Sequence, residues 1–193
     1  MILPILVYND LVLRKQCKEL TPSYSQLEKL IANMFETMYN AKGVGLAASQ
    51  IGLDLRLFIV DTTPFSNDKN NEESRLLKNF KKVFINAKIL KNYGETWKFR
   101  EGCLSLPEVM GHVKRSSHIL IEYYDEHWNK HTETLDRIRA RVIQHEYDHI
   151  EGKLFIDHLS SLKRQLVSNK LKDISEGKIK IDYPIKPPLS KNK

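Results

Sequence analysis

The sequence predicts an α+β domain in which antiparallel β-strands pack around a central helix that carries His145 and His149, with an N-terminal amphipathic helix and a C-terminal helix. Two observations lead to this fold class. Apolar residues recur at helical spacing in residues 25–40 and again after Asp136. Between these segments lie short β-rich runs separated by polar turns, which is typical of an antiparallel sheet.

The first predicted helix covers residues 25–40. Its apolar side chains fall on one face, which is expected to pack on a core: Leu27, Leu30, Ile31, Met34, Phe35 and Met38. The closely spaced glycines of residues 41–52 then end the helix. Strands are expected at residues 55–61, 82–90, 118–125 and 131–136, and a polar surface loop at residues 63–74.

The helix that carries His145 and His149 is predicted to begin near Asp136 and to stop at Gly152. A C-terminal helix over residues 161–174 is expected to turn Leu162 and Leu166 inward and its lysines outward. We assign residues 1–176 to a single domain and residues 177–193 to a basic extension rich in proline and lysine. In this extension we expect one short strand, at residues 179–183, followed by disorder.

Composition restricts the class of protein. Hydrophobic residues make up 41% of the chain and charged residues 28%, which suits a soluble globular protein. No run approaches the roughly 20 apolar residues that span a bilayer, so no membrane partner is expected. Residues 1–10 lack a basic leader and are interpreted as an opening strand, not a signal peptide. The two cysteines, Cys17 and Cys103, lie far apart and imply no disulfide framework, so a reducing cytoplasm is the expected location.

The formal net charge is +7, with much of the excess in residues 78–91 and from residue 163 onward. Two interpretations stay open. The lysines either form a solvated surface or give weak, salt-sensitive attraction to a polyanion such as RNA.

The stretch QHEYDH, residues 144–149, carries the first chemical motif. On a helix, residues four apart face the same way with Cβ atoms about 6 Å apart, so His145 and His149 can bind one metal ion. Glu146 points about 100° around the helix, where it can reach a water on that ion as a general base. A polar surface helix without a metal is the alternative.

A tetrahedral hydrolytic site needs three protein ligands and one open position. Glu151 lies too close to the second histidine, Glu176 stands in a weakly patterned polar stretch, and His158 lacks the spacing of a third histidine ligand. Cys103 in EGCLSLP is the better candidate, because a thiolate is a strong ligand for a borderline metal. A buried and inert cysteine is its alternative.

Three segments in this order resemble the peptide deformylase family: GVGLAASQ (residues 43–50), EGCLSLP (residues 101–107) and QHEYDH (residues 144–149). The resemblance covers nearly the whole chain, and it is weakest around residues 63–80 and over the last fifteen or so residues. It implies removal of the formyl group from N-formylmethionyl nascent peptides, and ribosome contact through the basic C-terminal region is a further hypothesis.

The resemblance also implies residue roles. One divalent metal, typically Fe²⁺ and replaceable by Ni²⁺ or Zn²⁺, would be held by Cys103, His145 and His149. A water on this metal would attack the formyl carbonyl with Glu146 as general base and then acid. The Gln50 side chain and the backbone N–H of Leu104 would form the oxyanion hole.

The sequence gives weaker signals for the substrate pocket and for the residues that hold the metal ligands in place. An apolar pocket for the methionine side chain is expected from Val44, Ile138 and Val142, whose alternative role is core packing. Gly45 is interpreted as room for a substrate backbone, since no phosphate-binding helix follows and no nucleotide cofactor is expected. Glu101 and Arg115 resemble a buried ion pair that fixes the cysteine loop.

Three positions depart from the family pattern. Met110 stands where many relatives carry an arginine that meets the peptide, Arg137 stands where relatives often have a glycine, and Asn86 is followed by Ala87 rather than the usual proline.

Two rival functions remain. One rival function is a zinc endopeptidase, in which Cys103→Ala leaves the metal in place. The other is a basic nucleic-acid or ribosome-binding module without catalysis.

Overall fold

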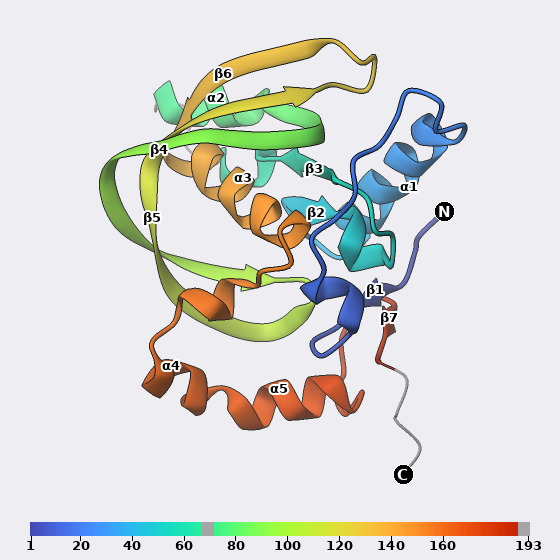
Figure 1. Cartoon of the computed structure of the whole chain (residues 1–193). Helices are drawn as coiled ribbons and strands as arrows, with labels where there is room; N and C mark the ends of the chain where they lie inside the picture. Colours follow the sequence, from blue (N-terminus) through green and yellow to red (C-terminus); the bar gives the residue numbers. More distant parts are fainter. Residues whose placement is uncertain (67–71, 189–193) are drawn as a thin grey trace.

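The computed structural model describes residues 1–66 and 72–188. Its centre is a five-stranded antiparallel sheet with strand order β2-β3-β4-β5-β6. The strands are β2 (Gly45–Ala47), β3 (Leu57–Asp61), β4 (Lys81–Cys103), β5 (Leu106–Tyr124) and β6 (Lys130–Asp136). The helix α3 (Arg137–Ile150) runs through the middle of the molecule, and the curved β4–β5 pair wraps around it (Figure 1). The predicted α+β class is confirmed.

The N-terminal helix α1 (Leu27–Asn40) forms as expected. Five of its six predicted face residues are buried, and Phe35 packs only partly against the same cluster. Short 3-10 turns, η1 (Leu11–Arg14) and η2 (Ala48–Ile51), precede and follow α1 along the chain. The core of this half consists of α1 side chains packed on β2, β3 and the start of β4.

A second part of the core lies around α3. Ala140, Val142, Ile143 and Ile150 on this helix pack with apolar side chains of β3, β4, β5 and β6. Because these strands hold α3 along most of its length, the side chains of residues 145–149 have a fixed position relative to the ends of β2 and β4. The helix begins with Arg137 at φ 44°, a left-handed backbone that glycine adopts with less strain than arginine.

The C-terminal region differs from the sequence-based expectation. Residues after η4 (Phe155–His158) form two helices, α4 (Ser161–Leu166) and α5 (Ser168–Ser175), instead of one. The prediction that Leu162 and Leu166 turn inward is wrong, since they are 69% and 77% exposed. Leu171 and Ile174 are the buried residues, because the break at Val167 changes which face meets the core.

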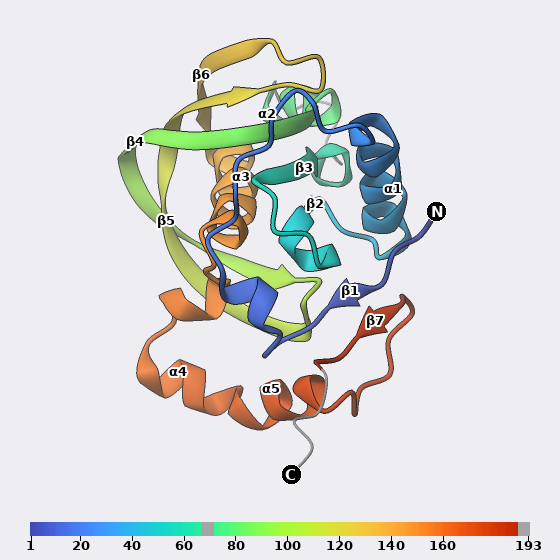
Figure 2. The same cartoon turned by 45° about the vertical axis from the view of Figure 1, so that its right-hand side comes forward.

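The predicted strand at residues 179–183 is also displaced. The strand is β7 (Ile185–Lys186), and it pairs in parallel with β1 (Ile5–Leu6). Figure 2 shows the two side by side, with the C-terminal segment returning toward the start of the chain. Pro184 begins this pairing by accepting a hydrogen bond from the Ile5 N–H at 2.9 Å. The predicted disorder falls partly on residues 189–193, which lie outside the described residues, and a domain boundary at residue 176 stays a prediction.

The expected polar loop of residues 63–74 is partly ordered. It contains the 3-10 turn η3 (Thr63–Phe65) and the first residues of α2 (Glu72–Lys78), while residues 67–71 lie outside the described part. Among the described residues, none of the helices combines the length and apolar character needed to cross a membrane.

Candidate metal centre

Three donor atoms meet where the end of β4 approaches α3. Cys103 is the last residue of β4, and His145 and His149 lie one turn apart on α3. Their ligand atoms all lie within 4.8 Å of one another, and Cys103 Sγ is 3.2 Å from Nε2 of His149. The predicted metal site of Cys103, His145 and His149 is confirmed.

The chemistry of these donors suits a borderline divalent metal. Burial opposes ionisation of the Cys103 thiol, but electrostatic attraction from His149 and a hydrogen bond with His145 lower its pKa to about 5. The site therefore offers a thiolate and two imidazoles, the donor set favoured by iron, nickel and zinc over magnesium or calcium. Three protein donors leave one position open for water or substrate.

Glu101, two residues before the cysteine, orients the first histidine. Its Oε2 lies 3.0 Å from Nδ1 of His145, so the ring directs its other nitrogen toward Cys103. Arg115 on β5 binds both carboxylate oxygens, at 2.8 and 3.0 Å. Burial alone would raise the pKa of Glu101, but hydrogen bonds from His145 and Arg115 hold this pKa well below its usual range.

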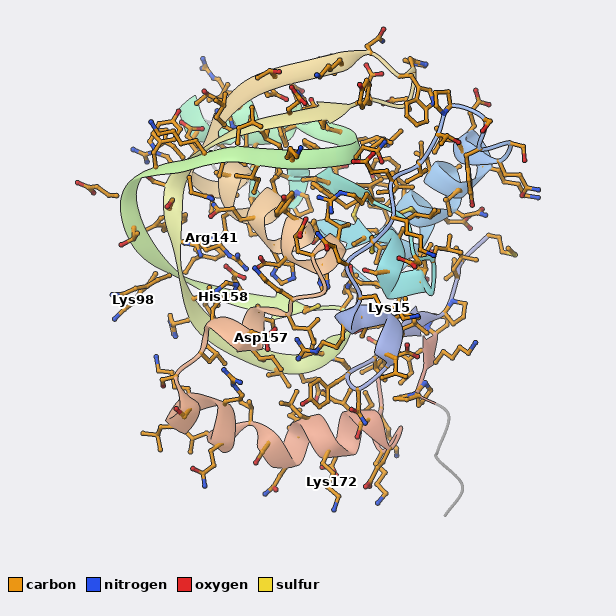
Figure 3. The ribbon with its side chains drawn as sticks, viewed as in Figure 1. Lys15, Lys98, Arg141, Asp157, His158 and Lys172 are labelled. Atoms are coloured by element: carbon orange, nitrogen blue, oxygen red, sulfur yellow. The ribbon has the colours of Figure 1, made fainter. Side chains whose placement is uncertain are left out.

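A second arginine, Arg141 on α3, belongs to the same network and is not evident from the sequence. Its side chain is 2% exposed, donates to Glu101 Oε1 at 2.9 Å, and stacks 4.5 Å from the centre of the Trp97 ring. Figure 3 shows it inside the molecule, next to α3. The available signal was its position one turn before His145, where an amphipathic helix directs a side chain inward.

Arg115 also links the metal helix to the segment after it. Its Nη1 binds Asp148 at 2.6 Å, and Asp148 accepts a hydrogen bond from His158 Nε2 at 2.8 Å. His158 therefore supports α3 from outside the metal site.

Glu146 has no hydrogen-bond partner at Oε2 among the described residues, although the side chain is only 4% exposed. Burial raises its pKa to about 7, against the attraction of His145 and His149. A carboxyl group with a pKa close to neutrality can both accept and return a proton. Gly45 lies against it: a Cβ there would stand 2.3 Å from Glu146 Oε1. The absence of a side chain at Gly45 thus makes room for Glu146, a reason that the sequence did not reveal.

Gln50 projects its amide group toward the cysteine. Its Oε1 accepts a hydrogen bond from the Ala47 N–H at 2.8 Å, which fixes the amide so that Nε2 faces Ser105 Oγ at 3.1 Å and Cys103 Sγ at 3.6 Å. The backbone N–H of Leu104 donates to none of the described residues. Two N–H donors therefore lie close to the cysteine, one of them without a protein acceptor.

A cavity of about 760 Å³ opens onto these groups. Val44, Gly45 and Val142 line it, as do Gln50, Leu104 and Glu146. Ile138 does not: it lies two turns before His145 and packs against the core, so its predicted place in the pocket is not supported. Arg141 lines the cavity instead, and Met110 stands at its rim, 42% exposed.

A thiolate and two imidazoles around one open position, beside a buried carboxyl group, define a metal-dependent hydrolase. Residues 2–165 match the family model of polypeptide deformylases. The chain is 59% identical to the peptide deformylase of Flavobacterium psychrophilum over 96% of this chain and 97% of that one. Identity to the peptide deformylase of Christiangramia forsetii is 54%, over 99% of this chain and 98% of that one.

Solved structures give the same result. A peptide deformylase from Legionella pneumophila superposes with a TM-score of 0.77 at 35% identity, covering 92% of this chain and 98% of that one. The peptide deformylase of Thermus thermophilus superposes with a TM-score of 0.79 at 36% identity, covering 92% and 99%. The chain belongs to the peptide deformylase family. The zinc endopeptidase and the non-catalytic module are thereby set aside.

Proposed function

We propose that the natural substrates are N-formylmethionyl nascent peptides, from which the enzyme releases formate, and that Glu146, Gln50 and Leu104 perform the chemistry. The observation that carries this proposal is the buried Glu146 Oε2, which lies beside three metal-binding atoms and lacks a partner among the described residues. Leaving a buried polar atom without a hydrogen-bond partner costs free energy. Such an atom is therefore expected where a substrate or water completes the site.

The metal would be held by Cys103, His145 and His149, and we propose Fe²⁺ in the cell, with Ni²⁺ or Zn²⁺ as substitutes. When bound, such an ion lowers the pKa of a coordinated water toward about 7 and polarises a carbonyl. The thiolate donates more charge than a third imidazole would, which makes the ion a weaker Lewis acid. Hydrogen-bond donors from the protein therefore have a larger share in stabilising the oxyanion.

Glu146 is the proton carrier in this proposal. It accepts a proton from the attacking water and returns it to the departing amine, so one carboxyl group acts as base and then acid. Its raised pKa suits both steps, because neither protonation state is strongly favoured near neutrality.

Gln50 and Leu104 are the proposed oxyanion donors. The fixed Nε2 of Gln50 faces Cys103 Sγ at 3.6 Å, and the Leu104 N–H directly follows the cysteine in the chain, so both donors are close to the proposed metal, where charge would develop on the formyl oxygen. Each such donor is worth on the order of 3 kcal/mol in the transition state. Val44 and Val142 supply an apolar wall for the methionine side chain.

The test combines metal analysis with an activity assay. Protein purified without oxygen is assayed on a formyl-methionyl peptide, in parallel with Glu146→Gln, which keeps the shape of the side chain. We expect wild type to release formate with iron bound, and Glu146→Gln to keep the metal and lose nearly all turnover. A Glu146→Gln variant as active as wild type would contradict the proposal.

We also propose that the enzyme acts in the reducing cytoplasm and that its basic C-terminal region transiently contacts the ribosome. Both cysteines are free, and the thiol at the metal site needs a reducing compartment. Leu162 and Leu166 are exposed beside lysines on α4 and α5, and Lys172 points away from the body of the protein (Figure 3).

Charge reversal tests the ribosome contact. Lys163→Glu with Lys172→Glu is expected to reduce co-sedimentation with ribosomes at low salt, because phosphate contacts depend on cationic side chains. Lys98→Glu, on strand β4 and outside the C-terminal helices, is the control (Figure 3). Equal binding of both variants would contradict this contact.

A further inference from the structure

The segment after α5 crosses from the C-terminal helices to the active-site cavity. Four consecutive residues of it line that cavity: Lys180, Ile181, Asp182 and Tyr183. All four lie beyond residue 165, where the match to the family model ends. This wall of the cavity thus comes from a part of the chain that the family model does not cover.

Both ends of the segment are anchored. Ile179 and Ile185 pack, as Cys103 does, against the buried cluster that includes Leu106, and β7 pairs with β1 shortly after Tyr183. Figure 2 shows how this pairing holds the segment against the N-terminal part of the protein. Tyr183 therefore stands on a fixed backbone and is itself partly buried.

Tyr183 makes one specific polar contact. Its hydroxyl donates a hydrogen bond to the backbone carbonyl of Leu104 at 2.8 Å. Leu104 and Ser105 form the turn between β4 and β5, directly after the ligand Cys103. The next carbonyl, that of Ser105, accepts a hydrogen bond from the Tyr8 N–H at 2.9 Å. The two carbonyls of the turn are thus held by Tyr183, just before β7, and by Tyr8, just after β1, and these two strands pair with each other.

The Leu104 side chain is confined as well. A Cβ at Gly43 would stand 2.8 Å from Leu104 Cδ1, so the leucine fills the space that this glycine leaves open. The carbonyl and side chain of Leu104 have fixed partners, while its N–H has none among the described residues. A donor that is held in place but unpaired is preorganised for an anion that forms during the reaction.

We infer that Tyr183 is a positioning residue for the Leu104 N–H, and that the C-terminal segment is thereby part of the active site. The inference rests on the proposed role of Leu104. Tyr183 acts through the Leu104 backbone: the phenol fixes the orientation of the turn, and the turn directs its N–H at the developing oxyanion. Loss of the hydroxyl should weaken stabilisation of the transition state more than binding of the substrate.

The test compares kcat and KM for formyl-methionyl peptide hydrolysis in wild type, Tyr183→Phe and Tyr183→Leu, with metal content and thermal unfolding measured on each. Tyr24→Phe is the matched control, because Tyr24 is also partly buried against the core cluster that Tyr183 contacts. For Tyr183→Phe we expect kcat to fall about tenfold, less than the 10²–10³ loss on deleting a donor outright. The KM and metal content of Tyr183→Phe should stay within about twofold of wild type, and so should the kcat and KM of Tyr24→Phe.

Several outcomes would overturn the inference. They are an unchanged kcat in Tyr183→Phe, a change in KM alone, a loss of metal, or a loss of kcat in Tyr183→Leu but not in Tyr183→Phe. The last result would show that the ring packs on the turn and that the hydrogen bond has no role. An inactive wild type would instead refute the proposed function, independently of Tyr183.

Discussion

The carboxylate of Glu146 on α3 lies directly against the backbone of Gly45 on β2, where a single added carbon atom would stand 2.3 Å from Oε1 and 2.7 Å from the carboxyl carbon. The rotamer of Glu146 is therefore constrained by a strand that is distant in sequence but packs against α3 in space. A residue that must transfer protons over short distances benefits from such a fixed position.

Gly45→Ala is the first prediction that follows. The methyl group must displace Glu146, and a displacement near 1 Å at a reacting group costs about 10² in kcat. We expect kcat to fall by about that factor while the metal stays bound, as measured by steady-state kinetics and metal analysis. Gly94→Ala is the control, because its methyl would meet the Ser117 and His118 side chains at 2.4 and 2.6 Å, and none of these three residues lines the cavity. It should lower stability and spare kcat; a Gly45→Ala enzyme with normal kcat would refute the constraint.

Arg141→Met tests the second arginine on Glu101. Methionine keeps most of the stem, but it removes a buried cation that Glu101 and the carbonyls of Val113 and Trp97 all contact. We expect the free energy of unfolding to fall by about 2–3 kcal/mol, since Arg115 still pairs with the carboxylate. Metal affinity should fall about tenfold, because Glu101 orients His145.

The matched control for this change is Arg139→Met on the same helix. Arg139 pairs with Asp136 near the surface, where such a pair is worth under about 1 kcal/mol. Denaturant unfolding and metal titration of both variants compare their unfolding free energies and metal affinities. Equal effects of the two substitutions would show that the buried network has no special role.

The two thiols are expected to react very differently once the metal is removed. Burial and the nearby Asp54 raise the pKa of Cys17 to about 11, so this thiol stays protonated and unreactive at pH 7.5. The pKa of Cys103 is lowered to about 5, so it is a thiolate at the same pH. Alkylation after chelation should therefore modify Cys103 alone, as peptide mass spectrometry would show. Rapid labelling of Cys17 in folded protein would contradict the claim that burial keeps this thiol protonated and unreactive.

The raised pKa of Cys17 also determines how this thiol changes the stability of the fold with pH. The folded state holds the Cys17 proton more tightly than the unfolded chain, whose cysteine titrates near 8.5. The contribution of this thiol to stability is thus complete below about pH 8 and is lost as the pH rises toward about 11. Cys17→Ala should flatten the decline in unfolding free energy over that alkaline range.

Local patterns in the sequence were sufficient for the parts of the site that lie on one element. The i, i+4 spacing of His145 and His149 follows from helix geometry alone, and the apolar face of α1 follows from its period. The choice of Cys103 as third ligand needed the chemistry of thiolates and then the family resemblance, because it comes from a distant strand.

Contacts between distant segments account for what the sequence did not predict. Arg141 finds its acceptors on β4 and β5, and Tyr183 finds Leu104 across 79 residues. The strand after residue 183 exists only because β1 offers an edge for it. Ile138 shares the helical period of Val142 but packs on the core, since period alone does not tell which neighbour covers a face.

The account depends most directly on the metal being held by sulfur and two imidazoles together. Its sharpest measurement is the metal content per chain of wild type, Cys103→Ala and the matched variant Cys17→Ala, purified side by side without oxygen. We predict about one ion in wild type and in Cys17→Ala, and almost none in Cys103→Ala, because two histidines alone make a weak site. Full metal occupancy and normal affinity in Cys103→Ala would contradict the account.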